Sequence, residues 1–375
     1  MGETVVVIGA GVSGLTTALL LSKDKANDVT VVAKHMPGDY DIERKRNAVR
    51  TIAKSLAGTF RSLNLGLGRM GSKEDSRFET QTWHELKRLC QDVPEAGIRF
   101  QRCQIQRREK DNGPSTLPNA LFDPKPWFAD LFPDYHELAP ADVLPGYDSG
   151  CEYTSVCINT AIYLPWLVGQ LLKNGVKLKR TVVSDIRDAK KMSHTGRPAT
   201  LIINASGLGS LKLGGVRDTT MFPARGQVVV VRNEMDAMLI VSGTEDGPSD
   251  ALYAMTRGGG GGSILGGTFQ ADSWESQPDP STALRIMKRV VEVKPEIAGG
   301  KGIAGLDVIR HAVGLRPYRK GGVRIEEERL DDETWIVHNY GHGGWGYQGS
   351  YGCANEVVGL VAKIQQKKQS CKAKL

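Results

Sequence analysis

The stretch Thr4-Val5-Val6-Val7-Ile8-Gly9-Ala10-Gly11-Val12-Ser13-Gly14-Leu15 near the start of the chain decides the fold. It begins with an apolar run that does not alternate with polar residues and is rich in β-branched side chains, which predicts a strand buried on both faces. Three glycines follow with the spacing G-x-G-x-x-G, an apolar helical pattern begins at Leu15, and a second strand is predicted at residues 29–33. This order of strand, glycine turn, helix and strand is typical of a dinucleotide-binding site.

Each glycine of the motif has a mechanical role in such a site. Gly9 permits a tight turn, Gly11 lets a pyrophosphate approach the backbone, and Gly14 lets the helix pack closely on the strand. The free N–H groups at the start of the helix then face the phosphates. The motif therefore predicts a set of cofactor-binding residues, namely Gly9, Ala10, Gly11, Val12, Ser13 and Gly14.

The end of the second predicted strand lacks the acidic residue that usually binds the adenosine ribose. Lys34 and His35 stand there instead. This departure disfavours NAD more than FAD as the cofactor. We expect both residues to lie beside the dinucleotide, with Lys34 facing either a ribose or phosphate group or simply solvent.

The composition is that of an ordinary globular enzyme, with 375 residues of which 40% are hydrophobic and 24% charged. No apolar stretch reaches the length of a membrane span, and the first strand begins too early for a secretory signal, so we expect no membrane partner. The cysteines form no C-x-x-C pair and no metal-ligand cluster, so we expect reduced thiols and no metal.

Residues 44–70 account for the whole net charge of +7, because they contain many basic residues and no acidic one. We therefore expect no nucleic-acid partner. Apolar residues recur at helical spacing between these charges, at Val49, Ile52, Leu56, Phe60 and Leu63. A basic amphipathic helix on an anionic surface is one interpretation. We favour a solvated helix or an atypical basic insertion.

Coarse patterns in the rest of the chain predict further helices at residues 78–90, 162–172, 282–293 and 354–365. A loop-rich segment is expected at residues 117–146. Further strands are predicted at residues 176–178 with a continuation at 181–183, and at 199–205, 228–231, 252–256, 263–268 and 334–338. The strands after Gly226 are short and separated by turns, which is typical of an antiparallel sheet.

These patterns predict an α/β fold in which a Rossmann-like nucleotide-binding domain is joined to an α+β substrate domain built on a mainly antiparallel sheet. We expect the nucleotide-binding domain to be discontinuous and to comprise residues 1–43, 155–225 and 306–375. The substrate domain is expected to comprise residues 71–154 and 226–305.

Two later segments and one turn carry further site residues. Arg316 lies between a Gly-Leu pair and a proline, which hold its backbone so that its planar guanidinium can pair with a carboxylate through two hydrogen bonds. The glycines of residues 338–348 let the backbone approach a flat ring system. The turn Ser206-Gly207 follows a buried strand and is expected beside the nucleotide.

Taken in order, these segments resemble the FAD-dependent D-amino-acid oxidases of the fungal, peroxisomal type. The resemblance implies an FAD cofactor and oxidative deamination of neutral D-amino acids to 2-oxo acids, ammonia and hydrogen peroxide, with hydride transfer to the flavin N5. Beyond the opening glycine motif, it rests on Asn204-Ala205-Ser206-Gly207, Ala224-Arg225-Gly226-Gln227, Leu252-Tyr253, Leu265-Gly266-Gly267-Thr268-Phe269, Gly314-Leu315-Arg316-Pro317 and Tyr340-Gly341-His342-Gly343-Gly344.

The resemblance also implies residue roles. Arg316 and Tyr253 would bind the substrate carboxylate, and Gly344 and Gln348 would line the amino-group side of the substrate and the O2 edge of the flavin; Tyr253, Arg316 and Gln348 would be the catalytic residues. Phe269 stands where mammalian D-aspartate oxidases carry an arginine, which favours neutral substrates. The flavin contacts implied are Val182, Ser206, Gly207, Gly343, Gly344, Gly346, Tyr347 and Gln348.

The chain departs from this family between Glu43 and Gly71. The family has there a short segment resembling Ser-Pro-Trp-Ala-Gly-Ala-Asn, which wraps the flavin, whereas this chain has the basic stretch 44–70. That stretch is either a lineage-specific insertion or an error in the assembled gene, such as a retained intron. Alternatives that stay open are a D-aspartate oxidase, a glycine or sarcosine oxidase, and an inactive homologue that has lost its flavin.

The last residues, Ala373-Lys374-Leu375, are close to the small-Lys-Leu address read by the peroxisomal import receptor. A solvated basic tail is the alternative. Because the implied reaction releases peroxide, the resemblance predicts the peroxisomal matrix as the location and the import receptor as a partner. The small-molecule partners implied are a D-amino acid and O2, and a homodimer is left open.

Overall fold

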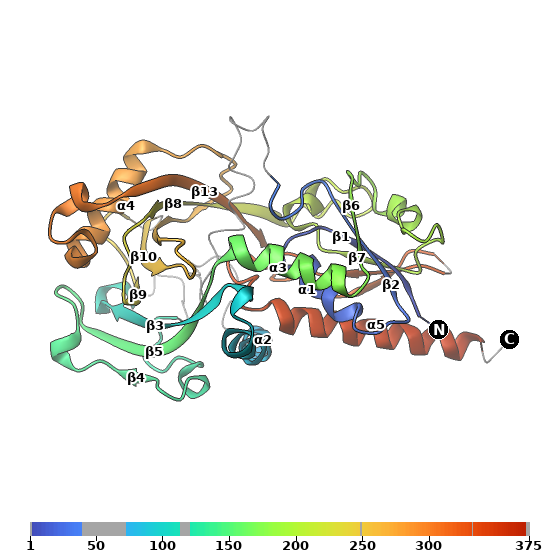
Figure 1. The fold of residues 1–375 in the computed structure, drawn as a ribbon, viewed down its shortest axis with the longest axis horizontal. Helices are drawn as coiled ribbons and strands as arrows, with labels where there is room; N and C mark the ends of the chain where they lie inside the picture. Colours follow the sequence, from blue (N-terminus) through green and yellow to red (C-terminus); the bar gives the residue numbers. More distant parts are fainter. Residues whose placement is uncertain (1, 40–72, 113–120, 248–249, 332, 373–375) are drawn as a thin grey trace.

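Two β-sheets organise the protein (Figure 1). The computed structural model describes residues 2–39, 73–112, 121–247, 250–331 and 333–372. One sheet has six strands in the order β14-β15-β7-β1-β2-β6, and the other has nine strands in the order β12-β8-β11-β10-β9-β3-β5-β4 with β13 paired to β8. The predicted fold class, a Rossmann-like unit with a second α+β unit on a mainly antiparallel sheet, is confirmed.

The six-stranded sheet is parallel except for β14. Its strands are β1 (Thr4–Ile8), β2 (Asp28–Ala33), β6 (Lys177–Arg180), β7 (Leu201–Asn204), β14 (Glu327–Arg329) and β15 (Trp335–His338). Strand β1 is buried on both faces, as its sequence predicts: Val5 and Val7 pack in the core with helices α1 and α5, while Val6 and Ile8 pack on the opposite side.

Helices cover one face of this sheet. They are α1 (Val12–Leu21), α3 (Thr160–Lys173) and α5 (Ser350–Lys372), while α2 (Lys73–Asp92) packs against α5 and against the nine-stranded sheet. Helix α1 packs against both α3 and α5, and α5 runs beneath the sheet (Figure 1). Near the end of α5, Lys368 forms an ion pair with Glu3, which precedes β1. Helix α1 begins three residues earlier than the apolar pattern predicts, directly after Gly11.

The nine-stranded sheet carries helix α4 (Pro280–Val293) on one face. Residues alternate between the two faces, so Leu252 packs with Ile286 and Val290 of α4, whereas Tyr253 projects to the opposite side. The strands are β3 (Ile98–Arg107), β4 (His136–Glu137), β5 (Ser149–Ile158), β8 (Met221–Val231), β9 (Ala237–Val241), β10 (Asp250–Thr256), β11 (Ser263–Thr268), β12 (Gln270–Ala271) and β13 (Val308–Arg319).

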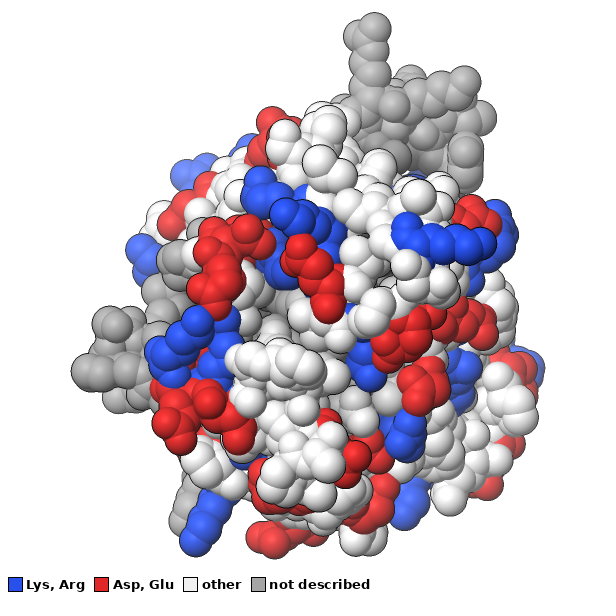
Figure 2. Space-filling model, turned by 90° about the vertical axis from the view of Figure 1, so that its left-hand side faces the viewer, with Lys and Arg blue, Asp and Glu red and all other residues white. Residues whose placement is uncertain are grey.

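Short 3-10 helices connect these elements. They are η3 (Pro94–Ala96), η4 (Glu109–Asn112), η5 (Ala129–Leu131), η6 (Pro140–Asp142), η7 (Ile186–Lys191), η8 (Gly207–Leu211), η9 (Pro295–Ala298) and η10 (Gly302–Gly305). On the end of the molecule formed by the nine-stranded sheet, basic and acidic side chains lie interspersed among uncharged ones (Figure 2). No helix in the described ranges is both long and apolar enough to span a membrane.

One strand prediction was wrong. Residues 181–183 do not continue β6, which ends at Arg180, and the side chain of Val182 is 60% exposed. The reason is that β6 is an edge strand paired only with β2, and β2 itself ends at Ala33. The Thr181 N–H still bonds to the Ala33 carbonyl, but the backbone beyond it has no strand to pair with.

The domain boundaries stay a prediction. Strands β5 and β8 run through the boundaries expected after residues 154 and 225, so each of these strands extends into both predicted segments. The basic stretch 44–70, its expected helical pattern and the tail Ala373-Lys374-Leu375 lie outside the described residues.

Candidate active site

The carboxyl ends of the parallel strands form the floor of the site. The strand register pairs Ile8 with both Val32 and Asn204, and it pairs Asn204 with His338. Because these strands end together, the segments that follow them lie along one edge of the sheet, where such folds bind nucleotides. The register thus brings together the motif Gly9–Gly14, the turn Ser206-Gly207 and the segment that contains Gly343, Gly344, Gly346, Tyr347 and Gln348.

Other predicted cofactor residues lie farther along the same edge. Lys34 and His35 follow β2, and Val182 lies two residues beyond the end of β6. Lys34 and Val182 are exposed, whereas His35 is partly buried. These residues can contact a ligand bound over β1 through their backbone groups or through their accessible side chains.

The three motif glycines differ in what surrounds them. Gly9 has a φ of +112°, and a Cβ atom on it would lie 2.3 Å from the Ala205 carbonyl oxygen. A Cβ atom on Gly14 would lie 2.0 Å from the Gly9 carbonyl oxygen. At Gly11, by contrast, no atom of the described residues lies within 4 Å of the Cβ position. The fold therefore requires Gly9 and Gly14, while the space beside Gly11 is open to a ligand.

The start of helix α1 is suited to a phosphate. Gly11 is its N-cap residue, no side chain caps the first turn, and that turn contains no acidic residue. Uncapped N–H groups and the partial positive charge of a helix N-terminus favour a bound anion.

The glycine turn after β15 holds buried polar atoms without partners. Gln348 is buried, yet among the described residues neither its amide nitrogen nor its amide oxygen has a hydrogen-bond partner, and the same is true of His342 Nε2. Leaving such a group unpaired costs on the order of 1–3 kcal/mol. Burial lowers the pKa of His342 to about 4, so this ring is neutral at physiological pH. His342 Nδ1 lies 3.3 Å from the Ser13 hydroxyl, which links this turn to helix α1.

These features fit FAD. The open space at Gly11 and the uncapped helix suit a pyrophosphate, and the unpaired atoms of Gln348 and His342 suit the hydrogen-bonding edge of a flavin ring. Tyr347 is also buried, with its ring centroid 6.4 Å from that of Tyr163 in α3. The residues predicted from the sequence to bind the cofactor are thus compatible with it.

Arg316 lies on β13 with its guanidinium over Gly226. A Cβ atom on Gly226 would lie 2.5 Å from Arg316 Nη1, so the glycine makes room for the side chain. Nη1 donates to the Thr268 carbonyl oxygen at 3.2 Å. Within the described residues Arg316 forms no ion pair with an acidic side chain, and it is only partly buried. A guanidinium held in this way can receive a carboxylate from solution.

Tyr253 meets Arg316 from strand β10. Burial raises the pKa of Tyr253, and hydrogen bonding to the Arg316 guanidinium opposes that rise. Its ring lies directly on the backbone of Gly266, where a Cβ atom would come within 2.1 Å of the ring. The structure therefore brings together the two residues that were predicted to bind a substrate carboxylate.

An aromatic cluster connects Arg316 to the glycine turn. The Tyr318 ring lies 5.4 Å from the Phe269 ring and 5.7 Å from the Phe222 ring, measured between centroids. Burial raises the pKa of Tyr318 to about 12, and its hydroxyl contacts the Gly344 backbone. Phe269 and Gly344, both predicted to bind substrate, thus each contact Tyr318.

Tyr318 and Phe222 were not predicted from the sequence. A signal for Tyr318 existed, because it stands two residues after Arg316 and side chains at that spacing share one face of a strand. Phe222 offered no signal of its own, since it reaches the site only through the pairing of β8 with β13.

The different surroundings of the glycines lead to a test. Replacing Gly11 by alanine should leave the melting temperature of the FAD-free protein within about 2 °C of wild type, because its Cβ meets no atom. The same methyl group should raise the dissociation constant for FAD by about tenfold or more, since it occupies the space of the pyrophosphate. Thermal unfolding and titration of flavin fluorescence measure the two quantities.

The matched control is Gly359→Ala in helix α5, another glycine with no atom near its Cβ position. That variant should bind FAD as wild type does. A Gly11→Ala protein with unchanged FAD affinity would contradict the assignment of this turn to the pyrophosphate.

Comparisons with known proteins agree with this geometry. The sequence profile described as FAD dependent oxidoreductase matches residues 4–360. The chain is 61% identical to a D-amino-acid oxidase of Fusarium vanettenii over 97% of this chain and 98% of that one. It is 27% identical to a D-aspartate oxidase of Talaromyces thermophilus over 99% and 98% of the two chains.

Among solved structures, glycine oxidase from Bacillus cereus ATCC 14579 has a similar fold, with a TM-score of 0.70 at 18% identity over 96% of this chain and 95% of that one. The match of the family profile and the extent of the Fusarium alignment confirm the resemblance that the sequence motifs indicate. The chain belongs to the family of FAD-dependent oxidoreductases that contains the D-amino-acid oxidases.

Proposed function

We propose that the protein oxidises neutral D-amino acids with FAD as its cofactor and O2 as the electron acceptor. The products are a 2-oxo acid, ammonia and hydrogen peroxide. The single observation that carries this proposal is the Arg316 guanidinium, which contacts Tyr253 and has no acidic partner among the described residues. The similarity to the Fusarium D-amino-acid oxidase supports it.

The residues of the chain bind and orient the substrate. Arg316 pairs with the carboxylate through two hydrogen bonds, and Tyr253, whose raised pKa keeps the hydroxyl protonated at neutral pH, donates to the same group. Bound FAD supplies the capacity to accept a hydride from the substrate Cα and to deliver the electrons to O2. Fixing the carboxylate and the amino group leaves one direction for the Cα–H bond, which selects one enantiomer.

The first test removes the guanidinium. Arg316→Leu should lower kcat/KM for D-alanine by roughly 100-fold or more, because the substrate carboxylate loses its charged partner. FAD affinity should stay within about twofold of wild type, since Arg316 lies on the substrate side of the site. Peroxide release and flavin absorption measure the two effects.

Arg316→Lys is the informative companion variant. It keeps the charge but loses the planar fork, so its activity should lie between those of Arg316→Leu and wild type. Wild-type turnover in Arg316→Leu would show that the carboxylate is bound elsewhere.

The second test concerns the substrate side chain. Phe222, Phe269 and Tyr318 form an apolar cluster beside Arg316, and none of these three side chains can form an ion pair with a second carboxylate on the substrate. Purified protein should therefore release peroxide from D-alanine about ten times faster, or more, than from D-aspartate. Phe269→Arg should narrow this difference, whereas Phe269→Leu should not.

The same substrate panel separates the alternatives. A preference for D-aspartate, glycine or sarcosine would assign the protein to another oxidase class. Protein that is colourless and stays colourless with added FAD would indicate a homologue that has lost its flavin.

The tail Ala373-Lys374-Leu375 supports import into the peroxisomal matrix through the receptor that reads small-Lys-Leu ends. Deleting these three residues should move a fluorescently tagged protein from peroxisomes to the cytosol, as seen by microscopy. The tag is placed at the N-terminus, and Lys367→Ala serves as a control that removes a basic residue without changing the tail. Peroxisomal fluorescence that survives the deletion would show that another signal directs import.

A further inference from the structure

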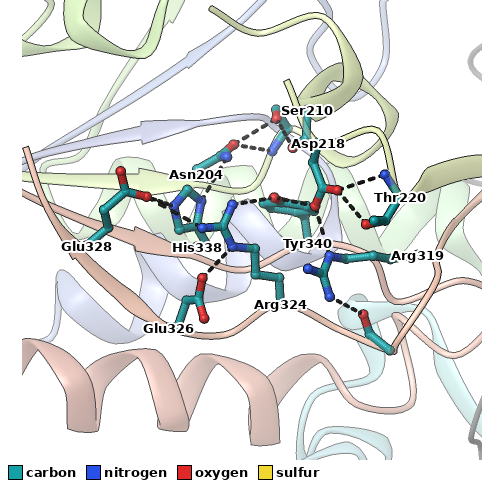
Figure 3. A network of polar contacts seen from close by, with 12 residues as sticks. Asn204, Ser210, Asp218, Thr220, Arg319, Arg324, Glu326, Glu328, His338 and Tyr340 are labelled. Atoms are coloured by element: carbon teal, nitrogen blue, oxygen red, sulfur yellow. Dashed lines mark hydrogen bonds and ion pairs between the residues drawn. The ribbon is translucent and has the colours of Figure 1, made fainter. Parts of the chain in front are cut away.

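A buried carboxylate, Asp218, joins three segments around the site (Figure 3). Its Oδ2 accepts hydrogen bonds from Arg319 Nε and from the Tyr340 hydroxyl, each at 2.8 Å. Its Oδ1 accepts from the backbone N–H of Thr220 at 3.0 Å and from the Thr220 hydroxyl. Both oxygens of the carboxylate therefore accept hydrogen bonds from the protein, as a side chain that is only 7% exposed requires.

The electrostatics of Asp218 follow from these contacts. Burial would raise its pKa, but the hydrogen bonds from Thr220, Arg319 and Tyr340 outweigh this and hold the pKa well below its usual range. Asp218 is thus ionised at neutral pH, and its hydrogen bond from the Arg319 guanidinium joins two charged groups, which is the stronger kind of hydrogen bond.

The network continues to a second cofactor segment. The Tyr340 hydroxyl accepts from Arg324 Nη1 at 2.9 Å, and Arg324 also pairs with Glu328. Glu328 contacts His338 Nε2 at 3.0 Å, and His338 Nδ1 lies 3.1 Å from the Asn204 amide nitrogen. Asn204 in turn accepts from the Ser206 N–H, which begins the Ser206-Gly207 turn.

The position of Asp218 relates the substrate side of the site to the cofactor side. Arg319 lies on the same strand as Arg316, three residues farther along, and Tyr340 directly precedes the turn that begins at Gly341. The strand and the turn already touch, because the Gly343 N–H bonds to the Pro317 carbonyl oxygen at 2.9 Å. Asp218 fixes the far end of that contact by holding Arg319 and Tyr340 at once.

We propose that Asp218 is a positioning residue that keeps the Arg316 strand and the flavin-side glycine turn in one fixed arrangement. Hydride transfer depends on the alignment of the substrate Cα–H bond with the flavin, and an error of 1 Å is enough to slow it by about 100-fold. Strand β13 places one reactant and the turn after β15 places the other. The inference rests on the proposed function, because it assumes that these two segments hold a carboxylate substrate and the flavin.

The test compares two variants with a matched control. Asp218→Asn removes the charge without changing the shape, and Tyr340→Phe removes one hydroxyl and keeps the buried ring. The control is Asp331→Asn. Like Asp218, Asp331 accepts hydrogen bonds from the backbone and from a basic side chain, here the N–H groups of Glu333 and Thr334 and Lys190 Nζ. It stands before strand β15, however, whereas Tyr340 follows that strand. All three proteins are assayed in their FAD-loaded form and after removal of FAD.

For Asp218→Asn and Tyr340→Phe we expect a rise of about tenfold in the FAD dissociation constant and a fall of about tenfold in the rate of flavin reduction by D-alanine. Stopped-flow absorbance measures the second quantity. KM for D-alanine should change less than kcat, since Arg316 and Tyr253 are left in place. Asp331→Asn should match wild type in all of these quantities.

Two results would overturn the proposal. One is FAD affinity and a reduction rate within twofold of wild type in both variants, and the other is an equal loss in the Asp331→Asn control. If Asp218→Asn does not fold, Tyr340→Phe decides alone. If the wild-type protein does not oxidise D-amino acids at all, the proposed function fails, whereas the FAD affinities still test the role of Asp218.

Discussion

The in-register pairing of β1 with β7 and of β7 with β15 is the constraint on which the site depends. Ile8, Asn204 and His338 end their strands at the same level, so three segments that are far apart in sequence emerge side by side. The register is fixed because each strand is buried on both faces, and a slip of one residue would exchange the side chains that face the helices for those that face η7.

Strand β13 adds the substrate side to this frame. It pairs with β8 along nearly its whole length, and the alternation of a strand places Arg316 and Tyr318 on one side. Arg316 then meets Tyr253, while Tyr318 packs against Gly343, where a Cβ atom would lie 2.5 Å from the Tyr318 ring. A single strand therefore carries both Arg316 and the aromatic side chain that packs against the glycine turn after β15.

The sequence predicted the parts of the fold whose residues carry their own signal. The glycine motif and the buried strands β1, β2, β7 and β15 belong to this group. Arg316 was singled out by its place between a Gly-Leu pair and a proline. Strands β3 and β5 were missed because they carry polar side chains such as Arg102, Gln104 and Glu152. Neither segment has the apolar pattern of a strand, and each forms one because it pairs with the other. Asp218 was missed for the same reason, since its partners Arg319 and Tyr340 lie 101 and 122 residues away in the sequence.

The buried polar groups near the proposed site include a paired network and a few unpaired atoms. Those of the Asp218 network are paired with one another, and paired networks in a low-dielectric interior are rigid. In the part of the chain that the structure describes, Gln348 and His342 Nε2, at the glycine turn after β15, are unpaired. Their cost, on the order of 1–3 kcal/mol for each group, is recovered only when a ligand supplies the missing partners. Because the paired network is rigid, a ligand that binds the unpaired groups does not have to order the surrounding side chains, and little of its binding free energy is lost in that way.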